Sequence, residues 1–361
     1  MTYVFTSESV SEGHPDKVCD FISDSVLDAH LAQDPNARVA CETLVKGNHV
    51  VLAGEISSHA VVDHEAVVRE SVRQIGYVHP AERFHADSLH LSLLLSRQAP
   101  EIGQGVDSGG AGDQGIMFGF ATDETPELMP LPILLAHRLS RQLADDRRAD
   151  RVNWLRPDAK TQVSVEYDDA NRPVAVRTVL VSTQHAASIS QEEIRAFVAS
   201  ELAPFALGEW WNDDIVLLVN PTGSFVEGGP SADAGVTGRK IIVDSYGGMG
   251  RHGGGAFSGK DASKVDRSGA YFTRWAARQI VEAGIAHRAE VQVAYAIGRA
   301  EPLSVRVDTD GSGNAAHAEA FVCGLDFRPA AIIERFDLRR PIFRSTTNYG
   351  HFGRPELPWE Q

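Results

Sequence analysis

One order of strands and helices recurs three times along the 361 residues and limits the possible folds more than any other feature. In each repeat a strand and a long helix come first, and two strands, a second helix and a closing strand follow. Alternating apolar residues indicate the strands, and apolar residues three or four positions apart indicate the helices. The first repeat is predicted as strand 3–6, helix 15–32, strands 38–45 and 50–56, helix 64–75 and strand 89–95. The second is predicted as strand 115–121, helix 131–149, strands 161–167 and 174–183, helix 191–202 and strand 215–219. The third is predicted as strand 240–244, helix 264–283, strands 290–297 and 303–307, and helix 315–323, before a less regular tail.

This order predicts an α+β protein made of three similar βαββαβ-type subdomains, each with helices on one face of a small sheet. The predicted subdomains are residues 1–97, 113–226 and 227–361. Between the first two lies the glycine-rich segment 98–112 (QAPEIGQGVDSGGAG). We expect it to be a mobile loop that covers an active site, with a plain linker as the alternative.

The formal net charge of −15 makes the chain a poor ligand for nucleic acid unless its basic residues gather in one place. The apolar runs are too short to span a bilayer, and the first residues do not resemble a secretory signal. The three cysteines have no pairing or zinc-site spacing. We therefore expect a cytoplasmic protein that binds neither nucleic acid nor a membrane.

A glycine-rich stretch, GGAFSGK at 254–260, fits the G-x-x-x-x-G-K pattern of a P-loop, after a predicted strand and before a predicted helix. Asp261 stands where a P-loop needs a hydroxyl for Mg²⁺, which counts against that interpretation. A loop whose backbone approaches an anionic ligand is favoured, and a flexible surface loop is the alternative. Five cations surround the stretch, with Asp266 among them as a possible Mg²⁺ ligand, and together they suit a polyphosphate: Arg239, Lys240, Lys260, Lys264 and Arg267.

The segment 6–20 (TSESVSEGHPDKVCD) leads into the first long helix, with Pro15 in its first turn. His14, Asp16 and Lys17 at the helix entrance are predicted to form a small ion and phosphate site. Aspartates follow at positions 16, 20, 24 and 28, on one helical face. For Asp20 and Asp28 a solvated face is the preferred interpretation.

Residues 46–48 (Lys-Gly-Asn) are typical of a hairpin turn. With Gly47 and Asn48 as the loop, position 42 pairs with 53 and position 40 with 55, so Glu42 and Glu55 lie diagonally on one face. Two such carboxylates favour a nearby cation or ammonium group, while ordinary exposed glutamates remain the alternative. Asp158 and Lys160 lie at a predicted strand entrance, where turn chemistry explains them equally well.

With these motifs the sequence resembles the S-adenosylmethionine synthetase family along essentially its whole length. The similarity lies in 6–20, in GAGDQGIMFGF (110–120), in GGGAFSGKD (253–261), in SKVDRS (263–268) and in 154–160, 238–244 and 350–354. The resemblance implies three similar α+β subdomains around a pseudo-threefold axis. It also implies a homodimer or a dimer of dimers, with active sites between two subunits.

The resemblance also implies residue roles. His14 would hydrogen-bond the oxygen that leaves carbon 5′ of ATP, and Asp113 would belong to the acidic catalytic shell. The residues that would hold ATP and its triphosphate are His14, Asp158, Lys160, Asp233, Arg239, Lys240, Ala256 and Lys260. Those that would contact methionine are Glu55, Gln98, Asp233 and Lys264. Two Mg²⁺ ions per active site are implied at Asp16 and Asp266, and K⁺ at Glu42.

The implied reaction joins methionine to the adenosyl group of ATP and hydrolyses the bound triphosphate to phosphate and diphosphate. The chain departs from the family pattern in a shorter loop before Gly110, in Ser224 where an arginine is usual, and in an early C-terminus after Glu360. Two other functions stay open: a P-loop phosphotransferase that leaves ADP, and a catalytically idle member that binds nucleotide and regulates a partner. Methionine analogues as substrates also stay open.

Overall fold

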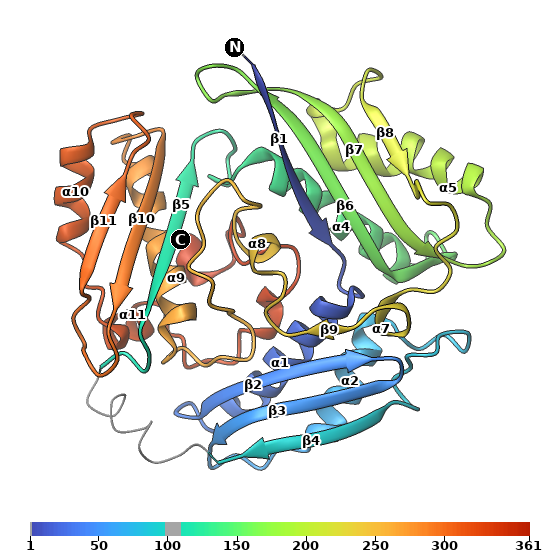
Figure 1. The fold of residues 1–361 in the computed structure, drawn as a ribbon, viewed down its shortest axis with the longest axis horizontal. Coiled ribbons are helices and arrows are strands. Elements are labelled where there is room, and N and C mark those ends of the chain that lie inside the picture. Colours follow the sequence, from blue (N-terminus) through green and yellow to red (C-terminus); the bar gives the residue numbers. More distant parts are fainter. Residues whose placement is uncertain (1, 98–109) are drawn as a thin grey trace.

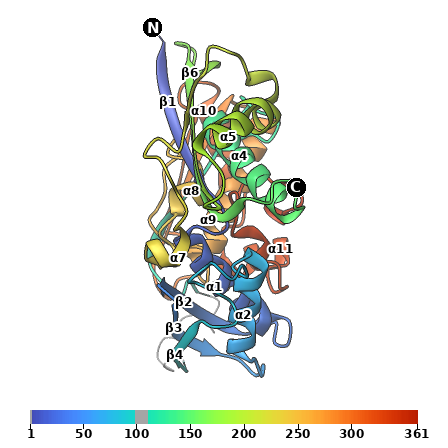
Figure 2. The ribbon, with the colours of Figure 1, turned by 90° about the vertical axis from the view of Figure 1, so that its right-hand side faces the viewer.

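The computed structural model describes residues 2–97 and 110–361 and contains three β-sheets (Figure 1). Seen from the side, the strands lie along one side of a flat molecule and the longer helices lie on the other (Figure 2). The predicted α+β class is confirmed. Among the described residues, no helix is long and apolar enough to cross a membrane.

The three sheets have similar make-up, with a long helix packed against each. The first has the order β4 (His90–Ser96), β3 (His49–Ser57), β2 (Arg38–Lys46), β9 (Gly235–Val236), and α1 (Pro15–Leu31) and α2 (His64–Ile75) accompany it. The second has the order β1 (Tyr3–Val10), β6 (Leu155–Tyr167), β7 (Pro173–His185), β8 (Val216–Val219), with α4 (Leu131–Arg148), α5 (Gln191–Phe197) and α6 (Ala203–Leu207). The third has the order β11 (Ser304–Asp308), β10 (Arg288–Tyr295), β5 (Gly115–Thr122), with α9 (Val265–Glu282) and α10 (Ala315–Cys323). The shorter helices are α7 (Gly229–Ala232), α8 (Ile241–Asp244) and α11 (Pro329–Phe336).

Each sheet takes one edge strand from a neighbouring segment of the chain. Strand β1 pairs antiparallel with β6, so that Ser7 lies opposite Val163. Strand β5 pairs with β10, and the two residues of β9 pair with β2. The first strand of each repeat therefore belongs to the sheet of the next repeat, in a cycle that returns to the start. The domain boundaries and the pseudo-threefold axis stay predictions, and this cyclic exchange agrees with such an axis.

The predicted strand 240–244 is wrong. Residues Ile241–Asp244 form the single helical turn α8, and the short strand of this repeat lies earlier, at Gly235–Val236. A run of only three apolar residues fits one turn of helix as well as a strand, so periodicity alone cannot separate the two. The helix predicted at 191–202 is α5 followed by a π-helical turn, Val198–Leu202.

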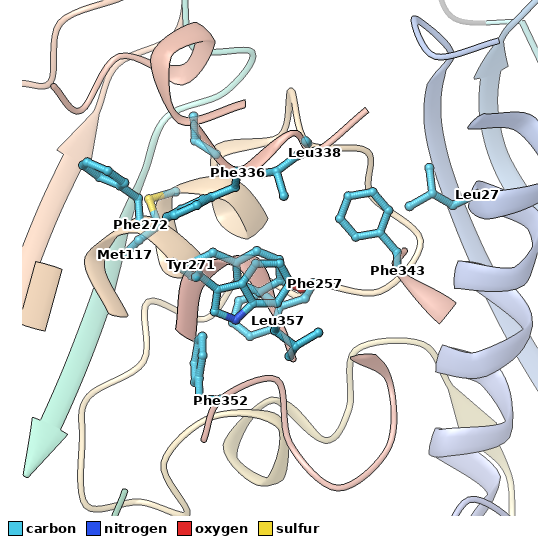
Figure 3. Close-up of a cluster of buried hydrophobic side chains, with 14 of the residues drawn as sticks. Leu27, Met117, Phe257, Tyr271, Phe272, Phe336, Leu338, Phe343, Phe352 and Leu357 are labelled. Carbon is cyan, nitrogen blue, oxygen red and sulfur yellow. The ribbon is translucent and has the colours of Figure 1, made fainter. Parts of the chain in front are cut away.

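The C-terminal tail is part of the hydrophobic core. Trp359 is fully buried and stacks on Tyr271 of α9 with ring centroids 3.7 Å apart. Figure 3 shows Phe343 of the same tail between α1, which carries Leu27, and the aromatic cluster around Phe257. The packing of these tail residues therefore fastens α9 to α1.

Asp16, Asp20 and Asp24 of α1 are buried and Asp28 is half-buried with both oxygens bonded, so the predicted solvated face at Asp20 and Asp28 is wrong. Asp24 forms a two-pronged ion pair with Arg267 of α9, with both N–O distances 2.7 Å. Asp28 accepts the backbone N–H groups of Phe343 and Arg344 at 3.0 and 2.9 Å. Carboxylates four residues apart follow one line along a helix, and here that line faces the C-terminal part of the chain rather than water.

Candidate active site

The first group of predicted site residues gathers where α1 begins. His14 is the residue before the helix, and its Nδ1 accepts the N–H of Asp16 at 3.2 Å. The carboxylate of Asp16 accepts the N–H of Val236 at 3.0 Å and the ammonium group of Lys240 at 2.6 Å. We call this group the α1 cluster, and its members are His14, Asp16, Asp158, Lys160, Asp233, Arg239 and Lys240.

His14 is uncharged at neutral pH. Its side chain is buried, and burial together with the positive charge of Lys240 lowers its pKa to about 3, although Asp16 acts in the opposite direction. Because Nδ1 accepts a hydrogen bond, the ring proton is assigned to Nε2. His14 is therefore a neutral hydrogen-bond donor among cations.

Lys17 is not part of a phosphate site, which corrects the sequence prediction. Its ammonium group is fully buried and forms ion pairs with Asp20 and Asp244. Asp20 in turn accepts the N–H of Gly238 at 2.8 Å. This buried set anchors the segment that carries Arg239 and Lys240, so Lys17 positions the cations of the site and does not contact a ligand.

The other members of the α1 cluster lie on β6 and beside α7. Asp158 is buried, and one carboxylate oxygen accepts the N–H of Gly229 at 2.8 Å while the other has no hydrogen-bond partner within the described residues. Burial raises the pKa of Asp158 to about 6. Lys160 and Asp233 are exposed, and the charge of Lys160 contributes to the low pKa of His14. Arg239 is exposed as well.

The second group lies where the glycine-rich segment meets strand β2. The carbonyl of Gly259 accepts the N–H of Cys41 at 2.9 Å, and Asp261 N–H donates to Val39 at 3.1 Å. A Cβ at Gly259 would lie 1.9 Å from the Cys41 oxygen, and its φ is +80°, so only glycine fits. The next residue, Lys260, forms an ion pair with Asp266 at 2.7 Å.

Asp266 is half-buried in the first turn of α9, and two glycines lie close to one of its carboxylate oxygens. That oxygen, Oδ1, has no hydrogen-bond partner in the part of the chain that the structure describes. It faces Gly255 and Gly115, where added Cβ atoms would lie 2.2 and 3.7 Å away. The P-loop interpretation is wrong, because the predicted strand before the segment is the helical turn α8 and because α9 begins only at Val265, five residues after Lys260.

Not all five predicted cations reach a ligand. Arg267 is fully buried in its pair with Asp24. The ammonium group of Lys264 contacts the carboxylate of Asp261 at 2.5 Å. The same carboxylate also accepts the N–H of Val39. Lys240, Lys260 and Lys264 are partly exposed and Arg239 is exposed, so these four form the accessible positive charge among the five.

The predicted pairing of the glutamates is confirmed. Glu42 lies opposite Ala53 and Glu55 opposite Ala40, and both side chains are exposed. Lys260 forms an isolated antiparallel β-bridge with Ala40, which places Lys260 beside the sheet face that carries the two glutamates. We call this group the α9 cluster, and its members are Glu42, Glu55, Asp113, Lys260, Lys264 and Asp266.

Asp113 is exposed two residues before Gly115, the glycine that faces Asp266. Gln98 lies outside the described residues, as does most of the predicted loop 98–112.

The two clusters lie at separate places along β2. Lys260 adjoins Ala40, and Val236, which binds Asp16, adjoins Leu44. Four residues of strand correspond to about 13 Å. Ala256 lies between the clusters, since a Cβ at Gly238 would be 2.3 Å from its methyl group.

Sequence reasoning missed Asp244 and Gly13 as supports of this site. Asp244 lay in a predicted strand, and only the fold shows it beside Lys17. A Cβ on Gly13 would lie 2.3 Å from the carbonyl carbon of Pro157, so this glycine brings His14 close to Asp158. A glycine directly before a histidine and a helix-starting proline was the available signal.

The comparisons with known proteins cover the whole chain. Residues 2–100 match the N-terminal domain of S-adenosylmethionine synthetase, residues 108–225 the central domain and residues 227–361 the C-terminal domain. The S-adenosylmethionine synthase of Akkermansia muciniphila is 53% identical over 99% of this chain and 95% of its own length. The S-adenosylmethionine synthase of Salinibacter ruber is 54% identical over 100% of this chain and 96% of its own length. That of Sorangium cellulosum is 52% identical over 99% of this chain and 87% of its own length. The chain therefore belongs to the S-adenosylmethionine synthetase family.

Proposed function

We propose that the α1 and α9 clusters together bind ATP and methionine and transfer the adenosyl group to the methionine sulfur. The chain is a methionine adenosyltransferase of S-adenosylmethionine biosynthesis, in line with its family and its relatives. The observation that carries the proposed residue roles is the α1 cluster. A neutral histidine N–H donor beside several cations suits an oxygen that becomes negative as it leaves.

The chemistry asks little of acid–base catalysis. The methionine sulfur is a neutral thioether with no proton to remove, so attack on carbon 5′ needs no general base. The difficult part is the departure of the triphosphate. His14 donates Nε2–H to the departing oxygen, and Lys160, Arg239, Lys240 and Lys260 stabilise the negative charge on the phosphates. The same cations support the later hydrolysis of bound triphosphate to phosphate and diphosphate.

The carboxylates fit the two expected Mg²⁺ ions in different ways. Asp266 has an oxygen beside two glycines that no donor of the described residues reaches. Both oxygens of Asp16, by contrast, have donors, one of them the ammonium group of Lys240. No group of three or more His, Cys, Asp or Glu residues suited to a metal occurs among the described residues. This agrees with Mg²⁺ held by one carboxylate and by substrate phosphates. The bound ions supply positive charge to the phosphates, and Glu42 is the proposed K⁺ ligand.

Methionine needs partners for its ammonium and carboxylate groups. Glu55 and Asp233 are exposed carboxylates that suit the ammonium group. Lys264 suits the carboxylate if it leaves Asp261, and Gln98 completes the proposed set. Methionine thus lies between residues of both clusters.

We propose a homodimer, or a pair of such dimers, with each active site between two subunits. The separation of the two clusters supports this, because a site between subunits lets one subunit supply the α1 cluster and its partner the α9 cluster. Exposed apolar side chains on strands of the three sheets also suit packing against a second copy: Leu44, Leu94, Ile116, Val216 and Leu218. A cytoplasmic location stays a prediction.

The test is to incubate the purified protein with ATP, methionine and Mg²⁺, with and without K⁺, and to identify the products by mass spectrometry. We expect S-adenosylmethionine with equal amounts of phosphate and diphosphate, and selenomethionine in place of methionine tests analogue use. Lys260→Met should lose most of this activity, while Arg306→Gln, an exposed charge change on β11, should keep it. ADP as the product would instead show a phosphotransferase, and ATP binding without any product would show a regulatory member.

A further inference from the structure

A cavity of about 300 Å³ lies between α1, the start of β2, residues 261–263 and the segment that contains α11. We propose that it binds a small organic anion with an apolar body, and that an occupant weakens methionine binding. The first part of this proposal rests on the cavity itself. The second part rests on the proposed function, in which Lys264 contacts methionine.

The cavity wall supplies a buried apolar surface. Leu31, Ala262 and Leu338 are nearly fully buried and line it, and Ile333 of α11 is half-buried beside them. Figure 3 shows Leu338 close to Phe336, at the edge of the aromatic cluster. An apolar wall with a few polar groups, at a volume near the lower end of ligand pockets, suits a small molecule.

Two arginines give the cavity its preference for an anion. Within the described residues Arg38 has one ion pair, with Oδ1 of Asp261 at 3.8 Å, which is too long for a hydrogen bond. Arg339 is exposed and has no ion pair within the described parts of the chain. By contrast, the next residue, Arg340, lies outside the cavity and pairs with Asp337 at 2.8 Å. Two guanidinium groups whose donors have no hydrogen-bond partner among the described residues are suited to a carboxylate, sulfonate or phosphate.

Asp261 connects the cavity to the α9 cluster. It lines the cavity, and its carboxylate faces two cations, Lys264 at 2.5 Å and Arg38 at 3.8 Å. An anion bound to Arg38 would neutralise one of these cations. Asp261 would then hold Lys264 more strongly, and the ammonium group of Lys264 would be less free to reach the methionine carboxylate.

The binding test uses 2-naphthalenesulfonate as the probe and isothermal titration calorimetry on the full chain saturated with ATP. We expect saturable binding that weakens about tenfold in Arg38→Gln and in Arg339→Gln, and that stays unchanged in the matched control Arg340→Gln. Ile333→Trp should fill the cavity and abolish binding. Neutral 2-naphthol and inorganic phosphate alone should each bind more weakly than the probe, because 2-naphthol lacks the negative charge and phosphate lacks the apolar body.

Saturable binding that none of the cavity variants weakens, or no binding to the parent chain, would overturn the proposed site. Since Arg339 is exposed, its substitution tests the site without risk to folding. The kinetic test measures the KM for methionine and for ATP with and without the probe. We expect a rise of about threefold in the methionine KM only. Binding without that rise would refute the coupling through Asp261, whereas absence of all transferase activity would refute the proposed function and leave the calorimetry valid.

Discussion

Arg267→Gln is expected to destabilise the protein strongly, because it leaves the carboxylate of Asp24 buried without its cation. Both side chains are fully buried. The guanidinium group of Arg267 uses all five of its N–H donors: two to Asp24 at 2.7 Å each, and one each to Tyr271, Lys260 and Thr346. The ring of Phe343 lies 4.2 Å from the guanidinium carbon.

The expected magnitude is about 3–5 kcal/mol, the range for removing one partner of a buried ion pair. Among the described residues outside its own helix, Asp24 then retains one donor, the N–H of Gly259 at 2.8 Å. Gly259 and the carbonyl of Lys260 belong to the glycine-rich segment of the α9 cluster. The substitution should therefore also reduce activity in conditions where the protein remains folded.

The assay is urea unfolding at one fixed protein concentration, followed by circular dichroism, with Arg306→Gln as the control for an exposed ion pair. The double variant Arg267→Met, Asp24→Leu should lose less stability than Arg267→Gln, since no charge is left buried. If Arg267→Gln loses no more stability than Arg306→Gln, the proposed role of this pair is refuted.

Three further predictions concern the site. Gly255→Ala places a methyl group 2.2 Å from Oδ1 of Asp266, so the Mg²⁺ concentration for half-maximal activity should rise about tenfold. The control Gly324→Ala, at a residue with an ordinary φ of −81°, should leave that concentration unchanged. Glu42→Gln should reduce the stimulation of activity by K⁺. The unfolding midpoint should not change, since the carboxylate of Glu42 is exposed. Equal stimulation of the variant and the parent by K⁺ would contradict the proposed K⁺ role. Burial raises the pKa of Asp158 to about 6, so its charge costs stability above that pH, and this cost disappears as the pH falls towards the unfolded value of about 4. Asp158→Asn should accordingly be more stable than the parent at pH 8, by at most about 3 kcal/mol, and urea unfolding at pH 8 and pH 4 checks whether the difference vanishes.

The membership of the family and much of the candidate site could be predicted from the sequence, because the motifs are short and contiguous. His14 and Asp16 lie within one helix entrance, and Lys260 and Asp266 within one loop and its helix. The register of Glu42 and Glu55 also followed from the sequence, since the turn at Gly47 and Asn48 fixes which residues of a hairpin face each other.

The state of each charged side chain could not be predicted in this way. Lys17 and Lys240 are equally basic in the sequence, yet Lys17 is sealed between Asp20 and Asp244, whereas Lys240 reaches Asp16 at the surface of the site. The two contacts that decide this difference, Lys17 with Asp244 and Lys240 with Asp16, each join residues more than 200 positions apart. Asp20 and Asp28 of α1 were assigned to a solvated face for the same reason.

By itself, the sequence determined the alternation of strands and helices, the α+β class and the family, because these depend on local periodicity and on short motifs. Only the tertiary structure decided that β1, β5 and β9 each complete another repeat's sheet, and that the tail that carries Trp359 closes the core. The physical reason is that strand pairing is made by backbone hydrogen bonds, which carry little information about their partner in the local sequence.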